Sequence, residues 1–234
     1  VSALGKEEDL RTLGIIRGEE LVDRWQENRT LIYAHRNGMD FRFVTRAEYR
    51  NKESLTQNLQ KEFPDALIIP EGGTNHQAVK GVQHMLNEGT KSFDYLCTAV
   101  GTGGTVAGLS KFAEEHQQVL GFKAVNDPTL EDEVFKLSGK KNFNLFEAHD
   151  GSYGKITDEN IRFINNFSEY YGIQLDPVYT GKMMRLIFRL IEEDFFPENA
   201  RILAFHTGGL QGISGANRML EEQNRPLIKL IKVD

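Results

Sequence analysis

The chain has 234 residues, enough for one large domain or two small ones. Apolar and charged residues make up 39% and 26% of it, as in an ordinary globular protein. The formal net charge of −6 and the lack of any Lys/Arg-rich run argue against nucleic acid as a partner. No apolar run approaches the ~20 residues needed to cross a bilayer, so no membrane partner is expected.

The first 70 residues alternate strand-like and helix-like patterns. The expected strands are 10–17, 40–44 and 66–69, and the expected helices are 31–35 and 46–63. Strands alternating with helices are typical of a parallel sheet. Pro70-Glu71-Gly72-Gly73 breaks this pattern. We therefore expect a smaller α/β domain at 1–70 and a larger one at 71–234.

The larger domain continues the alternation. After a helix capped by Thr74 or Asn75, the expected elements are strands at 96–100, 118–125, 143–146 and 201–205, with helices following 105, covering 127–137, and following 157, 181 and 209. In an open α/β sheet, ligands bind beyond the carboxyl ends of the strands. Small and hydroxyl residues gather at three segments of this kind, 101–105, 179–181 and 206–209. We expect these segments to meet at one ligand.

A glycine-rich turn joins the strand at 96–100 to the helix after it. Thr102, Gly103, Gly104 and Thr105 occupy this turn. A strand that turns into a helix in this way aims several backbone N–H groups at one point, and the helix dipole favours an anion there. Glycines let the backbone approach that anion closely. The turn is interpreted as a phosphate cradle, and a tight turn without a ligand is the alternative.

The residues after the turn limit the kind of phosphate. A P-loop has a Lys after its last glycine, whereas Gly104 is followed by Thr105. A dinucleotide fingerprint is only partly matched, because Gly101 and Gly103 fit while Val106 does not. Asp127, beyond the next strand, keeps a nicotinamide cofactor open as an alternative. A cofactor with a single phosphate fits this short loop best.

Two further patterns bear on chemistry and location. The 6 histidines show no His-x-His or His-Glu-x-x-His spacing, so no metal site is predicted. Cys97 is the only cysteine, so there is no internal disulfide and a reducing compartment, the cytoplasm, is expected.

Several segments, in this order and spacing, resemble one enzyme family. They are IIPEGGTNHQAVKG, VGTGGTVAGL, LDPVYTGKMM and ILAFHTGG, with GIIRGEE and NGMDFRFVTRAEYR before them. The chain is similar to the 1-aminocyclopropane-1-carboxylate deaminase and D-cysteine desulfhydrase family. The resemblance implies pyridoxal 5'-phosphate as cofactor and the tryptophan-synthase-β-like fold (fold type II), with two α/β domains whose parallel sheets are flanked by helices. It also implies a small amino acid as substrate, and a homodimer is expected.

The resemblance assigns roles to individual residues. Thr102, Gly103, Gly104 and Thr105 match the family's phosphate-binding loop. Tyr153 and Tyr179 match two active-site tyrosines near the cofactor and substrate. Thr180 and Thr207 complete the cofactor-binding set, with Thr207 at the position that can meet the pyridine nitrogen.

Two of these residues depart from the deaminases proper. Those enzymes carry an acidic residue where this chain has Thr180 and an apolar one where it has Thr207. A carboxylate at the pyridine nitrogen keeps it protonated and strengthens the electron sink, which a threonine hydroxyl does less well. The weaker sink favours a desulfhydrase-like β-elimination that gives keto acid, ammonia and sulfide. A 1-aminocyclopropane-1-carboxylate deaminase and a non-catalytic, cofactor-binding remnant are the alternatives.

One family feature is absent from these 234 residues. The family's Schiff-base lysine lies in a Gly-Asn-Lys segment near a Tyr-Ser-Asn-His segment, and neither occurs here. Lys182 matches a different family position. The chain opens at Val1 without Met, on residues typical of the second half of a helix. We therefore expect that an N-terminal segment with the lysine precedes Val1, and that activity requires it.

Overall fold

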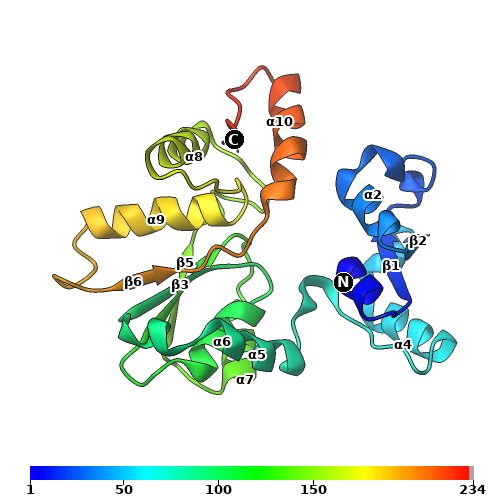
Figure 1. The fold of residues 1–234 in the computed structure, drawn as a ribbon, viewed down its shortest axis with the longest axis horizontal. Helices are drawn as coiled ribbons and strands as arrows, with labels where there is room; N and C mark the ends of the chain where they lie inside the picture. The colour runs from blue at the N-terminus through cyan, green and yellow to red at the C-terminus, as the bar shows by residue number, and fades with distance from the viewer. Residues whose placement is uncertain (232–234) are drawn as a thin grey trace. The chain divides into compact units, whose positions relative to one another are not determined.

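The computed structural model describes residues 1–231, and the chain divides into two compact units, Val1–Ile69 and Pro70–Asp234 (Figure 1). The division falls one residue before the boundary expected from the Pro-Glu-Gly-Gly segment. Each unit has a sheet of its own, and every strand pair in both sheets is parallel. The α/β fold with parallel sheets, predicted from the sequence, is confirmed.

The first unit is a two-stranded sheet with short helices. Strand β1 (Thr12–Arg17) pairs with β2 (Met39–Val44) from Thr12↔Met39 to Arg17↔Val44. The remaining elements are α1 (Ser2–Glu7), η1 (Glu19–Leu21), η2 (Trp25–Glu27), α2 (Arg29–Arg36), α3 (Arg46–Arg50) and α4 (Lys52–Glu62). Aromatic rings supply much of the packing, since Trp25 meets Phe41 edge-on with ring centres 5.4 Å apart.

Two predictions for the first unit are wrong. The helix expected over 46–63 is interrupted at Asn51, because its side chain accepts a hydrogen bond from Ser54 N and thereby starts α4. The strand expected at 66–69 does not form. This segment has no ladder partner among residues 1–231, and Leu67 is 81% exposed. A strand needs a neighbour to satisfy its backbone, and none pairs with this segment.

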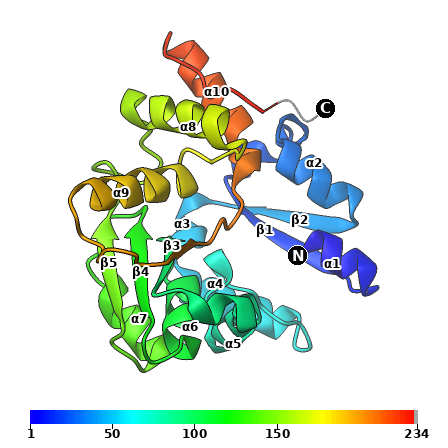
Figure 2. The same ribbon diagram turned by 60° about the vertical axis from the view of Figure 1, so that its left-hand side comes forward.

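The second unit is built on a four-stranded parallel sheet in the order β5-β4-β3-β6. Its strands are β3 (Tyr95–Val100), β4 (Gln118–Lys123), β5 (Phe143–Glu147) and β6 (Ile202–Ala204). Its helices are α5 (His76–Val82), α6 (Gly104–Phe112), α7 (Leu130–Ser138), α8 (Asp158–Tyr171), α9 (Thr180–Glu192) and α10 (Ile213–Glu222), with short 3-10 turns η3 (Glu71–Gly73), η4 (Gln83–Met85), η5 (Glu88–Ser92) and η6 (Leu210–Gly212). Figure 2 shows α9 on one side of β3, β4 and β5, with α6 and α7 on the other.

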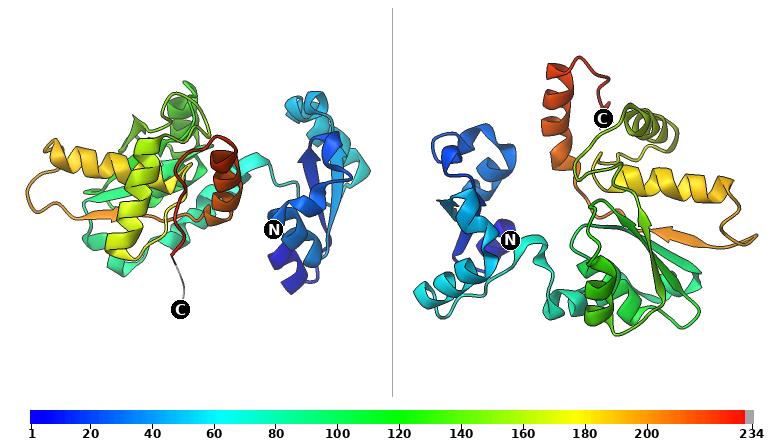
Figure 3. Two further views of the ribbon diagram at one scale, coloured as in Figure 1. Left: turned by 90° about the horizontal axis from the view of Figure 1, so that it is seen from above. Right: turned by 180° about the vertical axis from the view of Figure 1, so that it is seen from behind.

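The sheet is covered on both faces, as Figure 3 shows from two further sides. Leu96 and Val100 of β3 pack with α5, α6 and α7. Their neighbours Cys97 and Ala99 point the other way and pack with α9. Burial on both faces explains the continuous apolar run in β3, which is typical of parallel sheets.

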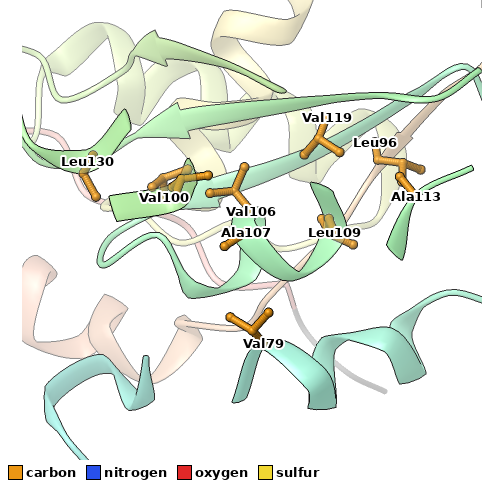
Figure 4. Packing of buried hydrophobic residues seen from close by; sticks show 10 residues of the cluster. Val79, Leu96, Val100, Val106, Ala107, Leu109, Ala113, Val119 and Leu130 are labelled. Atoms are coloured by element: carbon orange, nitrogen blue, oxygen red, sulfur yellow. The ribbon is translucent and has the colours of Figure 1, made fainter. Parts of the chain in front are cut away.

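A close helix–helix contact supports the α6 side of the core. Val79 of α5 is 1% exposed and points toward Ala107 and Leu109 of α6 (Figure 4). A Cβ built on Gly108 of α6 would lie 2.4 Å from the Cβ of Val82. The absence of a side chain at Gly108 therefore sets how closely the two helices approach.

We predict that Gly108→Ala destabilises the fold, because its Cβ would force α5 and α6 apart. Overpacking of this kind costs about 1–3 kcal/mol in the free energy of unfolding. The matched control is Gly215→Ala in the exposed face of α10, where a Cβ meets nothing within 4 Å. This control should gain roughly 0.5–1 kcal/mol from the better helix former. Urea unfolding of both variants measures the difference, and a stabilising effect at both positions would contradict the packing argument.

Candidate functional site

The turn between β3 and α6 has free backbone donors. Gly103, at φ +85°, is the N-cap residue of α6 and places no side chain over the helix end. The N–H groups of Gly103, Gly104 and Thr105 make no hydrogen bond to any other residue in 1–231. Such groups at a helix N-terminus, together with the dipole, favour an anion. The donor set therefore fits a phosphate group.

A second segment lies against this turn. Thr74 Oγ1 is 2.5 Å from Thr102 Oγ1. A Cβ on Gly104 would lie 2.6 Å from Thr74 Oγ1, and a Cβ on Gly72 would lie 2.6 Å from Thr102 Oγ1. The two glycines thus permit this close approach. The sequence suggested Thr74 or Asn75 as the cap of α5; Asn75 caps the helix, and Thr74 instead contacts Thr102 in the turn.

The two tyrosines expected at an active site meet each other. Tyr153 Oη and Tyr179 Oη are 3.1 Å apart, and either can donate the hydrogen bond. Tyr179 is half-buried and lies over the glycine turn, because a Cβ on Gly101 would be 3.3 Å from its Oη. Burial, and then the hydrogen bond with Tyr153, raise the pKa of Tyr179. Tyr153 is 61% exposed, so the pair has one sheltered and one open phenol.

The start of α9 is organised by a buried carboxylate that sequence analysis did not single out. Asp176 is 2% exposed and accepts hydrogen bonds from the N–H groups of Val178, Tyr179 and Thr180. Its Oδ2 also accepts from Thr180 Oγ1 at 2.6 Å. The sequence signal is the Asp176-Pro177 pair, because Asp before Pro favours a turn in which the carboxylate accepts from N–H groups two and three residues on.

This geometry bears on the expected cofactor role of Thr180. Its side chain is fully buried, and its Oγ1 both donates to Asp176 Oδ2 and accepts from Asp176 N at 2.9 Å. Both interactions hold the start of α9. The arrangement favours a structural role for the Thr180 hydroxyl over contact with a ligand.

Thr207 has different surroundings, in the exposed loop after β6. The neighbouring His206 is held on both ring nitrogens, since Nε2 lies 2.8 Å from Gln174 O and Nδ1 accepts from Gly208 N at 3.2 Å. Thr207 itself is exposed and its hydroxyl makes no hydrogen bond within residues 1–231. Its hydroxyl is therefore available to a ligand.

The three segments expected to meet do lie at one edge of the sheet. The pairing of β3 with β6, from Tyr95↔Ile202 to Cys97↔Ala204, brings the segments that follow these strands to the same edge. A Cβ on Gly209 would lie 2.9 Å from the Asp176 carboxyl carbon, so the loop after β6 touches the start of α9. Tyr179 joins the start of α9 to the glycine turn.

Residues 1–231 give little support to a nicotinamide cofactor, a metal ion or a cysteine nucleophile. Asp127 is engaged locally, accepting from both the N–H and the hydroxyl of Thr129. No three His, Cys, Asp or Glu side chains in this part of the chain are arranged to hold a metal ion. Burial raises the pKa of the Cys97 thiol to about 12, which disfavours a thiolate nucleophile. In the same residues, no helix combines the length and apolar character needed to cross a membrane.

Solved structures first define the class of the fold. A crystal structure described as an "ACC deaminase homologue" matches with a TM-score of 0.74 and 26% identity, over 93% of this chain and 72% of that chain. The processed form of threonine deaminase isoform 2 from Solanum lycopersicum is 14% identical, with a TM-score of 0.62 over 94% of this chain and 69% of that one, and shares the fold. The chain therefore has the fold of the fold type II enzymes.

Sequence relatives then indicate the family. The "Putative 1-aminocyclopropane-1-carboxylate deaminase" of Thermotoga maritima is 33% identical over 187 residues, which are 69% of this chain and 57% of that protein. The "Bifunctional D-cysteine desulfhydrase/1-aminocyclopropane-1-carboxylate deaminase, mitochondrial" of Arabidopsis thaliana is 28% identical over 75% of this chain and 51% of its own length. The resemblance drawn from the sequence is confirmed: this chain is a relative of the 1-aminocyclopropane-1-carboxylate deaminase and D-cysteine desulfhydrase family.

These matches cover only part of each relative. The chain spans just over half the length of these two relatives. No family model matches the chain.

The two threonines of the cofactor set should respond differently to loss of the hydroxyl. Thr180→Val removes the donor to the buried Asp176 carboxylate, and we expect a loss of about 1–3 kcal/mol in the free energy of unfolding. Thr207→Val removes an exposed hydroxyl and should change stability by less than about 0.5 kcal/mol. Urea unfolding compares them, and equal losses would show that Thr180 does not have the structural role described.

Proposed function

We propose that the protein carrying this chain is a pyridoxal-phosphate-dependent lyase or deaminase of a small amino acid. The observation that carries the proposal is the Tyr153–Tyr179 pair set beside the free N-terminus of α6. The names of the Thermotoga and Arabidopsis relatives support it. Within this class we favour a D-cysteine desulfhydrase-like β-elimination that releases keto acid, ammonia and sulfide.

The residues present fit the cofactor. The N–H groups of Gly103, Gly104 and Thr105 would hold its phosphate, and the Thr105 hydroxyl would add a donor, as the family resemblance implies. Thr207 would face the pyridine nitrogen, as the family resemblance implies. When bound, the cofactor supplies an electron sink that stabilises negative charge on the substrate's α-carbon.

The tyrosine pair is suited to holding a proton. Burial raises the pKa of Tyr179, so its phenol keeps its proton as the pH rises through about 10, where an ordinary tyrosine ionises. The hydrogen bond between the two Oη atoms gives that proton a path toward Tyr153, the more exposed of the two. Because Tyr179 lies over the glycine turn, we assign it as the hydrogen-bond donor that keeps a proton at the reacting group, and Tyr153 as its link toward solvent.

A 1-aminocyclopropane-1-carboxylate deaminase remains the second candidate, because both relatives carry that activity in their names. The two activities are separated by assaying D-cysteine and 1-aminocyclopropane-1-carboxylate side by side. A homodimer and a cytoplasmic location stay predictions of the sequence.

Cofactor binding is tested first, without any assay of turnover. Pyridoxal phosphate is titrated into the purified protein, and binding is followed by absorbance. Thr105→Val should weaken binding about tenfold, because it removes a hydroxyl beside a charged phosphate. The control, Thr30→Val in α2, should bind like the unmodified chain. Equal affinity of the two variants would contradict the phosphate site.

Turnover tests the tyrosine assignment. In the full protein, Tyr179→Phe should lower keto-acid release roughly 100-fold or more, as expected when a positioned proton donor is lost. Stability should fall by only about 1 kcal/mol, since one hydrogen bond is lost. Tyr170→Phe on α8, where the side chain is 83% exposed, is the matched control and should keep full activity. Undiminished release by Tyr179→Phe would rule out a catalytic role for its hydroxyl.

A further inference from the structure

A buried lysine lies one turn into α9, three residues after Tyr179. The Lys182 side chain is 1% exposed, and its Nζ donates a hydrogen bond to His149 O at 3.2 Å. An ammonium group removed from water is unfavourable unless it is partnered. Neither the glycine turn nor the tyrosine pair involves this charge. Its burial therefore calls for another explanation.

The partners of Lys182 all belong to the loop that carries Tyr153, residues 149–154, here called the tyrosine loop. Asp150 Oδ2 is 3.9 Å from Lys182 Nζ, and Asp150 Oδ1 accepts a hydrogen bond from Arg185. Arg185 also pairs with Glu159 Oε2 at 2.9 Å. Two cations one turn apart on α9 thus bind the start of the tyrosine loop.

Electrostatics make Lys182 and Asp150 depend on each other. Asp150 Oδ2 is buried and accepts no hydrogen bond within residues 1–231, so the Lys182 ammonium compensates its charge. Burial lowers the pKa of Lys182, and the Asp150 carboxylate opposes that shift.

Asp150 also has a φ of +54°, which is uncommon for a residue with a side chain. The pairing with α9 offsets the strain of that backbone conformation.

The tyrosine loop has few other connections. Gly151 N donates to His149 Nδ1, and Ser152 N donates to His149 O, the same oxygen that Lys182 binds. These are turn interactions within the loop, and its first residue is also tied to β5, because His149 Nε2 lies 2.8 Å from Glu147 Oε2. Tyr153, at the far side of the turn, is 61% exposed and reaches Tyr179 through its hydroxyl. Without the contacts to α9, an exposed loop of this kind would open easily.

We propose that Lys182 is a positioning residue: together with Arg185 it ties the tyrosine loop to α9 and so holds Tyr153 against Tyr179. Helix α9 then acts at both ends of the pair, because Tyr179 precedes its first residue and Lys182 holds the loop that brings Tyr153. The effect on turnover rests on the proposed function, whereas the effect on the loop does not.

Hydrogen exchange of the full protein, followed by mass spectrometry, tests the loop directly. Lys182→Met removes the charge but keeps a linear apolar side chain, and Asp150→Asn removes the charge from the loop side. In both variants, amides in 149–155 should exchange roughly tenfold faster or more, while those of β3 and β4 change little.

Two controls on α9 separate positioning from general destabilisation. Arg189→Gln removes a cation that contacts Glu159 but not the tyrosine loop. It should leave exchange in 149–155 unchanged. Ile187→Ala removes a buried core side chain and should raise exchange across the sheet as well. The proposal is overturned if loop exchange is unchanged in both Lys182→Met and Asp150→Asn. It is also overturned if these variants raise exchange across the sheet, as Ile187→Ala does.

Turnover provides the second readout. If Lys182 acts through Tyr153, then Lys182→Met should lower kcat when it is the only substitution. It should have little further effect on kcat when Tyr153→Phe is already present. Independent, multiplying effects would count against positioning. If no small amino acid is turned over at all, the proposed function fails, and the exchange result alone then decides whether Lys182 holds the loop.

Discussion

The buried carboxylate of Asp176 is the interaction on which the arrangement of the site depends. Four donors satisfy it, three of them N–H groups at the start of α9 and the fourth the Thr180 hydroxyl. A buried charge is tolerated when it is paired in this way. Asp176 thereby sets where α9 begins and places Tyr179 over Gly101, while its other side meets Gly209. Loss of this one carboxylate would loosen two of the three segments that form the site.

The parallel sheet explains why these segments can share one edge. Because both faces of β3 are covered by helices, a ligand can approach this strand only at its end, beyond Val100. The strand there becomes a glycine-rich turn and then α6, so the unpaired N–H groups of that turn lie at the edge of the sheet where the loop after β6 begins. The electrostatic preference for an anion thus follows from the topology as much as from the glycines.

The position of Thr180 changes how its departure from the family pattern is understood. At positions 180 and 207 this chain has threonine, whereas the deaminases proper have an acidic and an apolar residue. The structure engages the Thr180 hydroxyl with Asp176, so of the two hydroxyls only that of Thr207 is available to a ligand among residues 1–231, while the argument for a weaker electron sink still rests on the missing carboxylate at position 180. The two tyrosines, in contrast, meet as a hydrogen-bonded pair, with the hydroxyl of one sheltered and the other open.

The sequence by itself determined the local elements and the family. Alternating patterns marked strands and helices, and a cap at Thr74 or Asn75 marked the start of α5, which the structure gives to Asn75, because these signals act between residues close in the chain. Only the tertiary structure decided which polar groups have partners. The pairing of Thr74 with Thr102, the burial of Lys182 beside the tyrosine loop and the missing neighbour of 66–69 all depend on residues distant in sequence or on their absence. Hydrogen bonding and desolvation are properties of assembled surroundings, which local patterns do not contain.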